Sequence, residues 1–173
     1  MKFKLSMIML LASITLVACT NENISEEDYT EDIKELVHEY SVGDITDETA
    51  SITSEELIIT DSNERKVVIP LPEDEFFVSV APFINETHPC TNHSLTGCQG
   101  EMVNKEFDVY IEDTEGNVVL EDTLKTEANG FIDLWLPRNQ TYKVIITHNG
   151  KKVESELSTY EQDGTCITTM QLT

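Results

Sequence analysis

The sequence predicts a mainly β protein, with an antiparallel β-sandwich-like C-terminal domain and a small N-terminal helical and β-hairpin region. Two observations predict this fold. From residue 106 onward, short β-type segments recur between turn signals, two of which are the Asn-Gly pairs at 129–130 and 149–150. Before residue 54, in contrast, apolar residues recur at helical spacing instead of alternating with polar ones.

The chain begins with the order of a secretory signal: two lysines are followed by an apolar run from Leu5 to Ala18. That run is shorter than the roughly 20 residues that a membrane span needs. It ends in Leu-Val-Ala-Cys, which resembles the lipobox of bacterial lipoproteins. The resemblance implies that residues 1–18 are a lipoprotein signal peptide and that Cys19 is the site of lipid attachment. An ordinary signal with a cysteine near its end is the alternative.

Residues 19–53 are predicted to form an acidic tether and an amphipathic helix over residues 26–41. Ser25 is a suitable N-cap, apolar residues follow at intervals of three and four, and Gly43 is a natural stop. The segment from Thr46 to Ile52 is predicted to form one further helical turn.

The remainder of the chain is predicted as two regions. Residues 54–104 hold a β-hairpin and a Cys/His metal loop, and residues 105–173 form the sandwich-like domain. The predicted strands are Leu57–Thr60, Lys66–Ile69, Phe76–Val80, 107–111, Val118–Leu124, Phe131–Leu136, Tyr142–Thr147, Lys151–Tyr160 and Cys166–Leu172. The segment from Pro82 to Asn104 has no sustained period. Loops of that length inside a compact domain are usually functional or disordered, and we predict a functional loop.

The net charge of the chain is −22 at pH 7. Such a charge attracts cations and repels nucleic acid, so no nucleic-acid partner is expected. The sequence has no GxSxG, HExxH or Walker motif. We therefore expect a binding protein and not an enzyme.

The segment HPCTNHSLTGC, residues 88–98, holds two of the four cysteines and two of the four histidines of the chain. With Cys19 assigned to a lipid, three cysteines remain, and an odd number outside the cytoplasm leaves a spare thiol or a use other than a disulfide. Three interpretations stay open: a disulfide with one spare thiol, a soft-metal site, and a thiol–disulfide exchange site. They overlap, because a metal-binding thiol pair can oxidise when it is empty.

Soft-metal chemistry selects the candidate ligands. These are Cys90, Cys98, Cys166 and His93, with His88 and Met170 as weaker candidates. His88 precedes a proline, and Met170 lies four residues after Cys166, on the same face if both are in one strand. Thiolates select Cu(I), zinc or iron–sulfur clusters. Zinc would need a fourth ligand such as His93, and the spacing is not that of a zinc knuckle or ribbon, so copper is favoured over zinc.

Three separated motifs resemble the CueP family of copper-binding proteins of the bacterial periplasm. They are HPCTNHSLTGCQGE at 88–101, NGFIDLWLPRN at 129–139 and TCITTMQL at 165–172. The resemblance covers roughly residues 54–173. It implies copper binding through Cys90, Cys98 and Cys166, reduction of Cu(II) to Cu(I), a role in copper resistance, and a homodimer. The lipobox departs from the family pattern, and the N-terminal helix has no clear match, so the dimer carries over poorly.

The expected function is therefore that of an extracytoplasmic copper-binding protein, lipid-anchored to a bacterial membrane. It would sequester copper, hold it as Cu(I), reduce Cu(II) stoichiometrically, and contribute to copper tolerance or to transfer toward a copper exporter or a cuproenzyme. The alternatives are a thiol–disulfide oxidoreductase-type lipoprotein and a structural lipoprotein with one disulfide.

Overall fold

The computed structural model describes residues 26–173, and their side chains from residue 32 onward. In this part of the chain one helix, α1 (Glu26–Val42), precedes a series of strands. The strands are β1 (Thr49–Ile52), β2 (Glu56–Thr60), β3 (Lys66–Pro70), β4 (Glu75–Val80), β5 (His93–Ser94), β6 (Glu106–Asp113), β7 (Val118–Lys125), β8 (Ile132–Pro137), β9 (Thr141–His148), β10 (Lys151–Ser158) and β11 (Cys166–Ile167).

The larger unit is a β-sandwich built from two sheets, with strand orders β10-β9-β6-β7 and β11-β4-β8. Both sheets contribute to one apolar cluster, in which Phe76 and Val78 of β4 meet Phe107 and Val109 of β6. The strands alternate buried and exposed residues as period-2 packing requires, for example along β6 and β9. The predicted mainly β, sandwich-like fold is confirmed.

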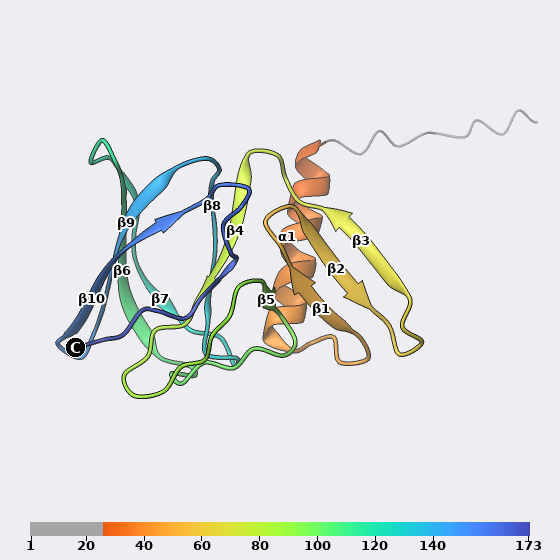
Figure 1. The fold of residues 1–173 in the computed structure, drawn as a ribbon, viewed down its shortest axis with the longest axis horizontal. Helices are drawn as coiled ribbons and strands as arrows, with labels where there is room; N and C mark the ends of the chain where they lie inside the picture. The colour runs from red at the N-terminus through yellow and green to blue at the C-terminus, as the bar shows by residue number, and fades with distance from the viewer. Residues whose placement is uncertain (1–25) are drawn as a thin grey trace, which may run out of the picture.

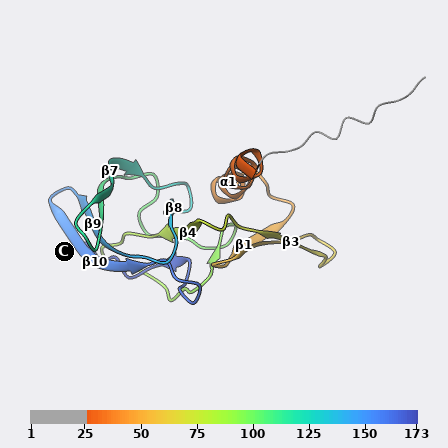
Figure 2. The same ribbon diagram turned by 90° about the horizontal axis from the view of Figure 1, so that it is seen from above.

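The smaller unit consists of α1 and the sheet β3-β2-β1-β5, which lie together on one side of the sandwich (Figure 1). Seen from above, α1 covers one face of this sheet (Figure 2). Ile33 and Val37 of α1 pack with Leu57 of β2, and Phe77 of β4 and Trp135 of β8 join the same cluster. The β4–β8 pair is therefore covered on both of its faces.

Most element predictions agree with the structure. The helix ends at Val42, and Gly43 follows with φ of 83°, a backbone conformation that glycine adopts without strain. The hairpin between β9 and β10 turns at Asn149 and Gly150, both of which also have positive φ. The division into regions at residue 104 stays a prediction, although β4 before it pairs with β8 after it.

Three local predictions are wrong. The segment from Thr46 to Ile52 does not form a helical turn, because Thr49–Ile52 pairs with β2 and gains its hydrogen bonds there. The last strand is only Cys166–Ile167, so Met170 does not share a strand face with Cys166. The long loop also contains a short strand, β5, which pairs with β1. The strands β1 and β5 both arise from pairing with another segment, which local periodicity does not report.

The predicted signal peptide and Cys19 lie outside the described residues. Within residues 26–173, no helix is long and apolar enough to cross a membrane.

Candidate metal centre

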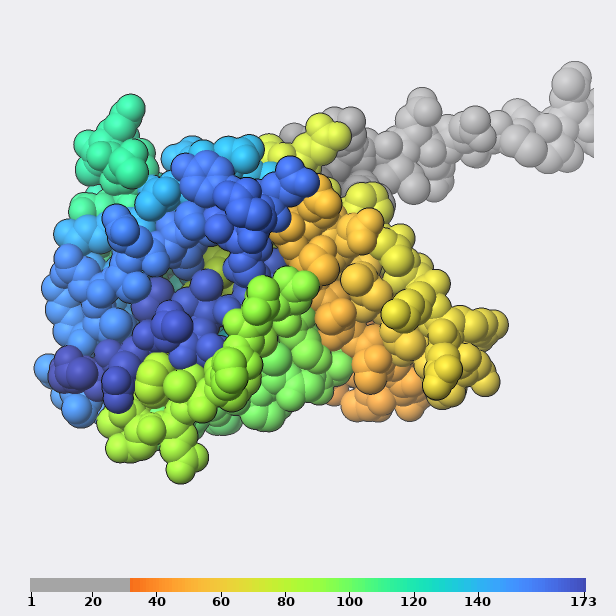
Figure 3. Space-filling view, viewed as in Figure 1, coloured from red at the N-terminus to blue at the C-terminus, as the bar shows by residue number. Residues whose placement is uncertain are grey.

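The Cys/His loop lies against the C-terminal strand, on the face of the molecule between the N-terminal and C-terminal parts (Figure 3). The backbone N–H of Cys166 donates to the carbonyl of Thr91 at 3.0 Å. The backbone N–H of His93 donates to Thr165 Oγ1 at 2.9 Å, and that hydroxyl donates to the carbonyl of Ile52 at 2.7 Å. Thr165 therefore ties the loop, β1 and the last strand together at one point.

Close contacts between backbone segments also hold the loop in place. A Cβ built on Gly100 would lie 2.6 Å from the carbonyl oxygen of Gly130, and one on Gly164 would lie 2.6 Å from that of Thr91. Only glycine fits such contacts. The three sequence motifs therefore meet in space through their glycines and through the residue just before the third motif.

A carboxylate fixes the outer part of the loop. Glu101 accepts hydrogen bonds from the backbone N–H groups of Ile84 and Asn85, at 2.6 and 3.0 Å for its Oε2. These donors favour the charged form and lower the pKa of Glu101 to about 2. The two ends of the loop are thereby joined close to Cys98.

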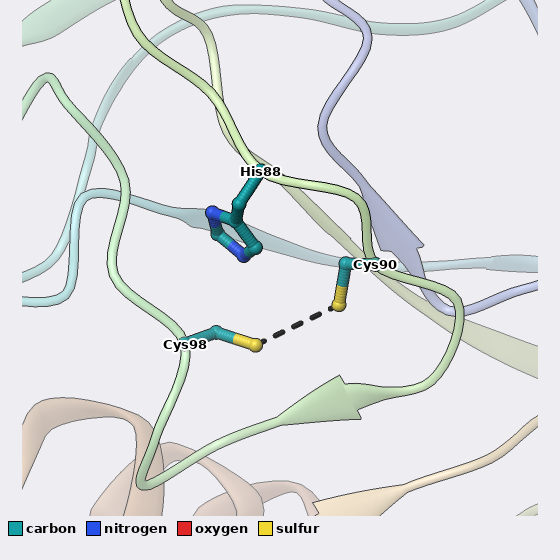
Figure 4. Close-up of side chains that lie close together, drawn as sticks. All are labelled: His88, Cys90 and Cys98. Atoms are coloured by element: carbon teal, nitrogen blue, oxygen red, sulfur yellow. Dashed lines mark hydrogen bonds between the residues drawn. The ribbon is translucent and has the colours of Figure 1, made fainter.

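The three cysteines lie in one small cluster with Ala81 and Phe131. Cys90 and Cys166 form a disulfide with a Cα–Cα distance of 5.6 Å, and Cys98 is a free thiol. The sequence alone did not indicate which two of the three cysteines form the disulfide. The Sγ atom of Cys98 is 3.6 Å from that of Cys90, as the dashed line in Figure 4 shows. A thiol that close to a disulfide sulfur is placed for exchange.

Two overlapping groups of possible metal ligands result, each with its ligand atoms within 4.8 Å of one another. The outer group is His88, Cys90 and Cys98, all partly exposed; Figure 4 shows the His88 ring beside the two sulfurs. The inner group is His93, Cys98 and Cys166, of which His93 and Cys166 are buried. Each group contains one disulfide sulfur. Since metal ions bind thiolates, each set of sulfur ligands is complete only after the disulfide is reduced.

His93 is the most enclosed member of the centre, with 0% of its surface exposed. Its ring lies 4.5 Å from that of Phe131, between centroids. Burial lowers the pKa of His93 to about 4, with a smaller contribution from the charge of His88. The imidazole is therefore neutral near pH 7, which is the form that binds metals.

The two ring nitrogens of His93 differ. Nε2 is 3.3 Å from Ser79 Oγ, whereas Nδ1 is buried and has no hydrogen-bond partner among the described residues. Leaving a buried polar atom unpaired costs about 1–3 kcal/mol. A metal ion bound at Nδ1 would remove that cost, so the residues present fit a soft metal.

The methionine candidate, and one histidine that was not a candidate, are placed as follows. Met170 is fully buried in the sandwich core, in a different cluster from the cysteines. The Nδ1 atom of His148 is 2.7 Å from the carbonyl oxygen of Glu106, in the sandwich.

Sequence reasoning missed two polar residues beside the centre, Ser79 and Asp133. Ser79 Oγ donates to Asp133 Oδ1 at 2.5 Å. A signal for both exists in the sequence, because each is a polar residue in an otherwise apolar strand: FFVSV and FIDLWL. A buried polar residue in such a strand needs a partner, and one partner of Ser79 is His93 of the candidate centre, 3.3 Å away at Nε2.

Comparison with known proteins agrees with this geometry. A family model described as periplasmic copper-binding protein CueP matches residues 32–171. The chain belongs to the CueP family. The crystal structure of S.CueP is similar, with a TM-score of 0.77 and 38% sequence identity, over 82% of this chain and 88% of that chain. A comparison with curated proteins found no match. The family match includes most of α1, which lies outside the three sequence motifs. The periplasmic description of the family also supports a location of this protein outside the cytoplasm.

Proposed function

We propose that this protein binds copper outside the cytoplasm and holds it as Cu(I) through Cys90, Cys98 and Cys166, with His93 as a further ligand. One observation carries the proposal. Three sulfur atoms converge beside a neutral, buried imidazole whose Nδ1 atom has no partner in the described chain. Thiolates prefer Cu(I) to harder cations, and three of them make a low-coordinate soft site to which His93 could add a fourth ligand.

The proposed redox role follows from the same sulfurs. In the reduced chain, Cys90 and Cys166 are thiols. Their oxidation to the disulfide releases two protons and two electrons, and each electron reduces one Cu(II) to Cu(I). The Cys90–Cys166 disulfide is then the spent state. Since no further electrons are available, reduction is stoichiometric until an external thiol reductant resets the pair.

The wider role is proposed from the sequence. Cys19 would carry the lipid that anchors the mature chain to the outer face of a bacterial membrane or within the periplasm. Bound copper would be sequestered there, or passed to a copper exporter or a cuproenzyme, and the chain would form a homodimer as the family resemblance implies.

One observation favours a second function. Cys98 lies 3.6 Å from a disulfide sulfur, an arrangement that would suit a thiol–disulfide oxidoreductase. In that function the disulfide would exchange with a partner protein and copper binding would be incidental.

Anaerobic Cu(I) titration of residues 20–173 against a competing chelator tests the proposal. The reduced chain is expected to bind one tight equivalent, and the oxidised chain to bind far more weakly. Changing Cys90, Cys98 or Cys166 to Ser should each weaken binding by more than the roughly 10- to 100-fold typical of losing an indirect partner. A parallel zinc titration should give weaker binding.

Ser155→Ala on the edge strand β10 serves as the control and should leave the affinity unchanged. Failure of the reduced chain to compete with the chelator, or indifference to all three cysteine changes, would reject the copper site. Rapid exchange of the disulfide with a model dithiol in that case would favour the oxidoreductase.

A further inference from the structure

A row of three residues crosses the sheet β11-β4-β8 beside the metal centre. Cys166 of β11 is the register partner of Ser79 of β4, and Ser79 is the register partner of Asp133 of β8. Side chains of directly paired residues point to the same face of a sheet. A proposed copper ligand, a hydroxyl and a carboxyl group therefore stand side by side, opposite the apolar face that fills the sandwich.

A chain of hydrogen bonds extends this row to His93 and to α1. Ser41 of α1 donates to Asp133 Oδ2, and Ser79 donates to Asp133 Oδ1, both at 2.5 Å. Ser79 Oγ also lies 3.3 Å from His93 Nε2. Ser41, Ser79 and His93 are all buried, and Asp133 is half-buried.

Counting protons along the chain assigns the tautomer of His93. A serine hydroxyl has one proton. The proton of Ser79 is directed to Asp133, so toward His93 the oxygen of Ser79 can only accept. The proton of the neutral imidazole must then be on Nε2, and Nδ1 keeps a free lone pair. Nδ1 is the ring nitrogen that has no partner among the described residues.

The assignment requires that Oδ1 of Asp133 accept the proton of Ser79. Burial raises the pKa of Asp133, although the hydroxyl groups of Ser41 and Ser79 act in the opposite direction. In the ionised form both oxygens accept. In a neutral form with the proton on Oδ2, that proton is donated to Ser41, and Oδ1 still accepts from Ser79. Both of these forms keep the proton of His93 on Nε2, whereas a proton on Oδ1 would move it to Nδ1.

We propose that Ser79 and Asp133, completed by Ser41 from α1, are positioning residues that fix His93 as its Nε2–H tautomer and present Nδ1 as the copper ligand. Metal-binding histidines commonly donate their second N–H to such a partner, which sets the ring orientation and raises its basicity. Here the carboxyl group acts through a hydroxyl. The copper part of this inference rests on the proposed function; the tautomer part does not.

The first test measures the tautomer without any metal. Nitrogen NMR of the oxidised, copper-free chain, labelled with ¹⁵N-histidine, is expected to show a pyrrole-type Nε2 and a pyridine-type Nδ1 for His93. The His93→Ala variant identifies the signals. Ser79→Ala should give a mixture of tautomers, and Ser79→Thr, which keeps the hydroxyl, should restore the wild-type pattern.

Asp133→Val gives the sharpest prediction. It removes the acceptor of the Ser79 proton, so Ser79 becomes free to donate to Nε2 and the proton of the imidazole should move to Nδ1. Thr159→Val is the matched control, since Thr159 is a fully buried hydroxyl that donates to the carbonyl of Pro137 elsewhere in the sandwich. It should leave the tautomer unchanged. An Nδ1–H tautomer in the wild-type chain, or a shift caused equally by Thr159→Val, would overturn the proposal.

The second test is a double-mutant cycle on Cu(I) affinity in the reduced chain. Ser79→Ala should weaken binding by about tenfold, at the lower end of the range for indirect partners. In a His93→Ala background the same change should have no further effect, because Ser79 acts through His93. Equal losses in both backgrounds would indicate a merely structural role and would overturn the proposal. If the wild-type chain binds no copper, the proposed function fails, while the NMR result still decides the tautomer.

Discussion

The two faces of the β4–β8 strand pair differ sharply, although they are made by alternate residues of the same two segments. On the face toward β6 and β9, Phe76 and Val78 of β4 lie in a wholly apolar cluster with Leu134 of β8. On the opposite face, the neighbours of these residues are Ser79 and Asp133, which meet His93. One face fills the sandwich core, whereas the other, where Phe77 and Trp135 pack against α1, also holds a polar row beside the proposed copper centre. The comparison teaches that a strand buried on both sides can separate stability from function residue by residue.

Removing an aromatic side chain from the apolar face should have the largest effect on stability. Phe76→Ala is expected to lower the free energy of unfolding by about 3–5 kcal/mol, because it leaves a cavity in a closed core. The Cu(I) affinity of the folded protein should not change. Denaturant unfolding and chelator competition on the same sample measure the two effects. A parallel loss of affinity would mean that the two faces are not independent.

Reduction of the Cys90–Cys166 disulfide should have the next largest effect. The bond closes a sequence separation of 76 residues, and opening it should lower the free energy of unfolding by about 4 kcal/mol in the chain-entropy description. Excess Cu(I) should restore much of that loss, because a ligand that binds only the folded state stabilises it. Thermal unfolding of the oxidised, reduced and copper-loaded reduced chains tests this. Stabilisation of the oxidised chain by copper to the same extent would contradict it.

Lowering the pH should decrease the free energy of unfolding through His93, which lies against the polar face. The pKa of His93 is lowered from 6.5 to about 4 in the folded protein, so between these values the unfolded state binds a proton that the folded state does not. The contribution of His93 to the free energy of unfolding is constant above about pH 6.5. It should fall as the pH decreases, by up to about 3 kcal/mol near pH 4.

The His93→Gln variant isolates this contribution, since the other titrating groups are retained. The difference in unfolding free energy between wild type and variant, measured from pH 7 to pH 4, should change by that amount. A constant difference across the range would show that His93 is not buried in its neutral form.

Met170→Leu should have the smallest effect. Met170 is fully buried in the apolar core, and a volume-conserving exchange there usually costs less than about 1.5 kcal/mol. Cu(I) affinity should be unchanged. A clear loss of affinity would place the thioether at the copper site and make the apolar face part of the chemistry.

The sequence was sufficient to predict the helix, most strands and the cluster of cysteines, because these depend on local periodicity, turn residues and motifs. It was insufficient for β1 and β5, whose short segments form strands only by pairing with each other and with β2. It was also insufficient for Ser79 and Asp133, since their role depends on a register between strands more than 50 residues apart. The cysteines and His93 could be found from sequence motifs, whereas Ser79 and Asp133 could be found only from the pairing of the strands.

Copper K-edge X-ray absorption of the reduced, Cu(I)-loaded chain tests the central claim most directly. We predict a ligand shell dominated by sulfur, with one nitrogen that disappears in His93→Ala and fewer sulfur ligands in each of the Cys90→Ser, Cys98→Ser and Cys166→Ser variants. A shell of nitrogen and oxygen without sulfur, or one unchanged by all four substitutions, would contradict the account.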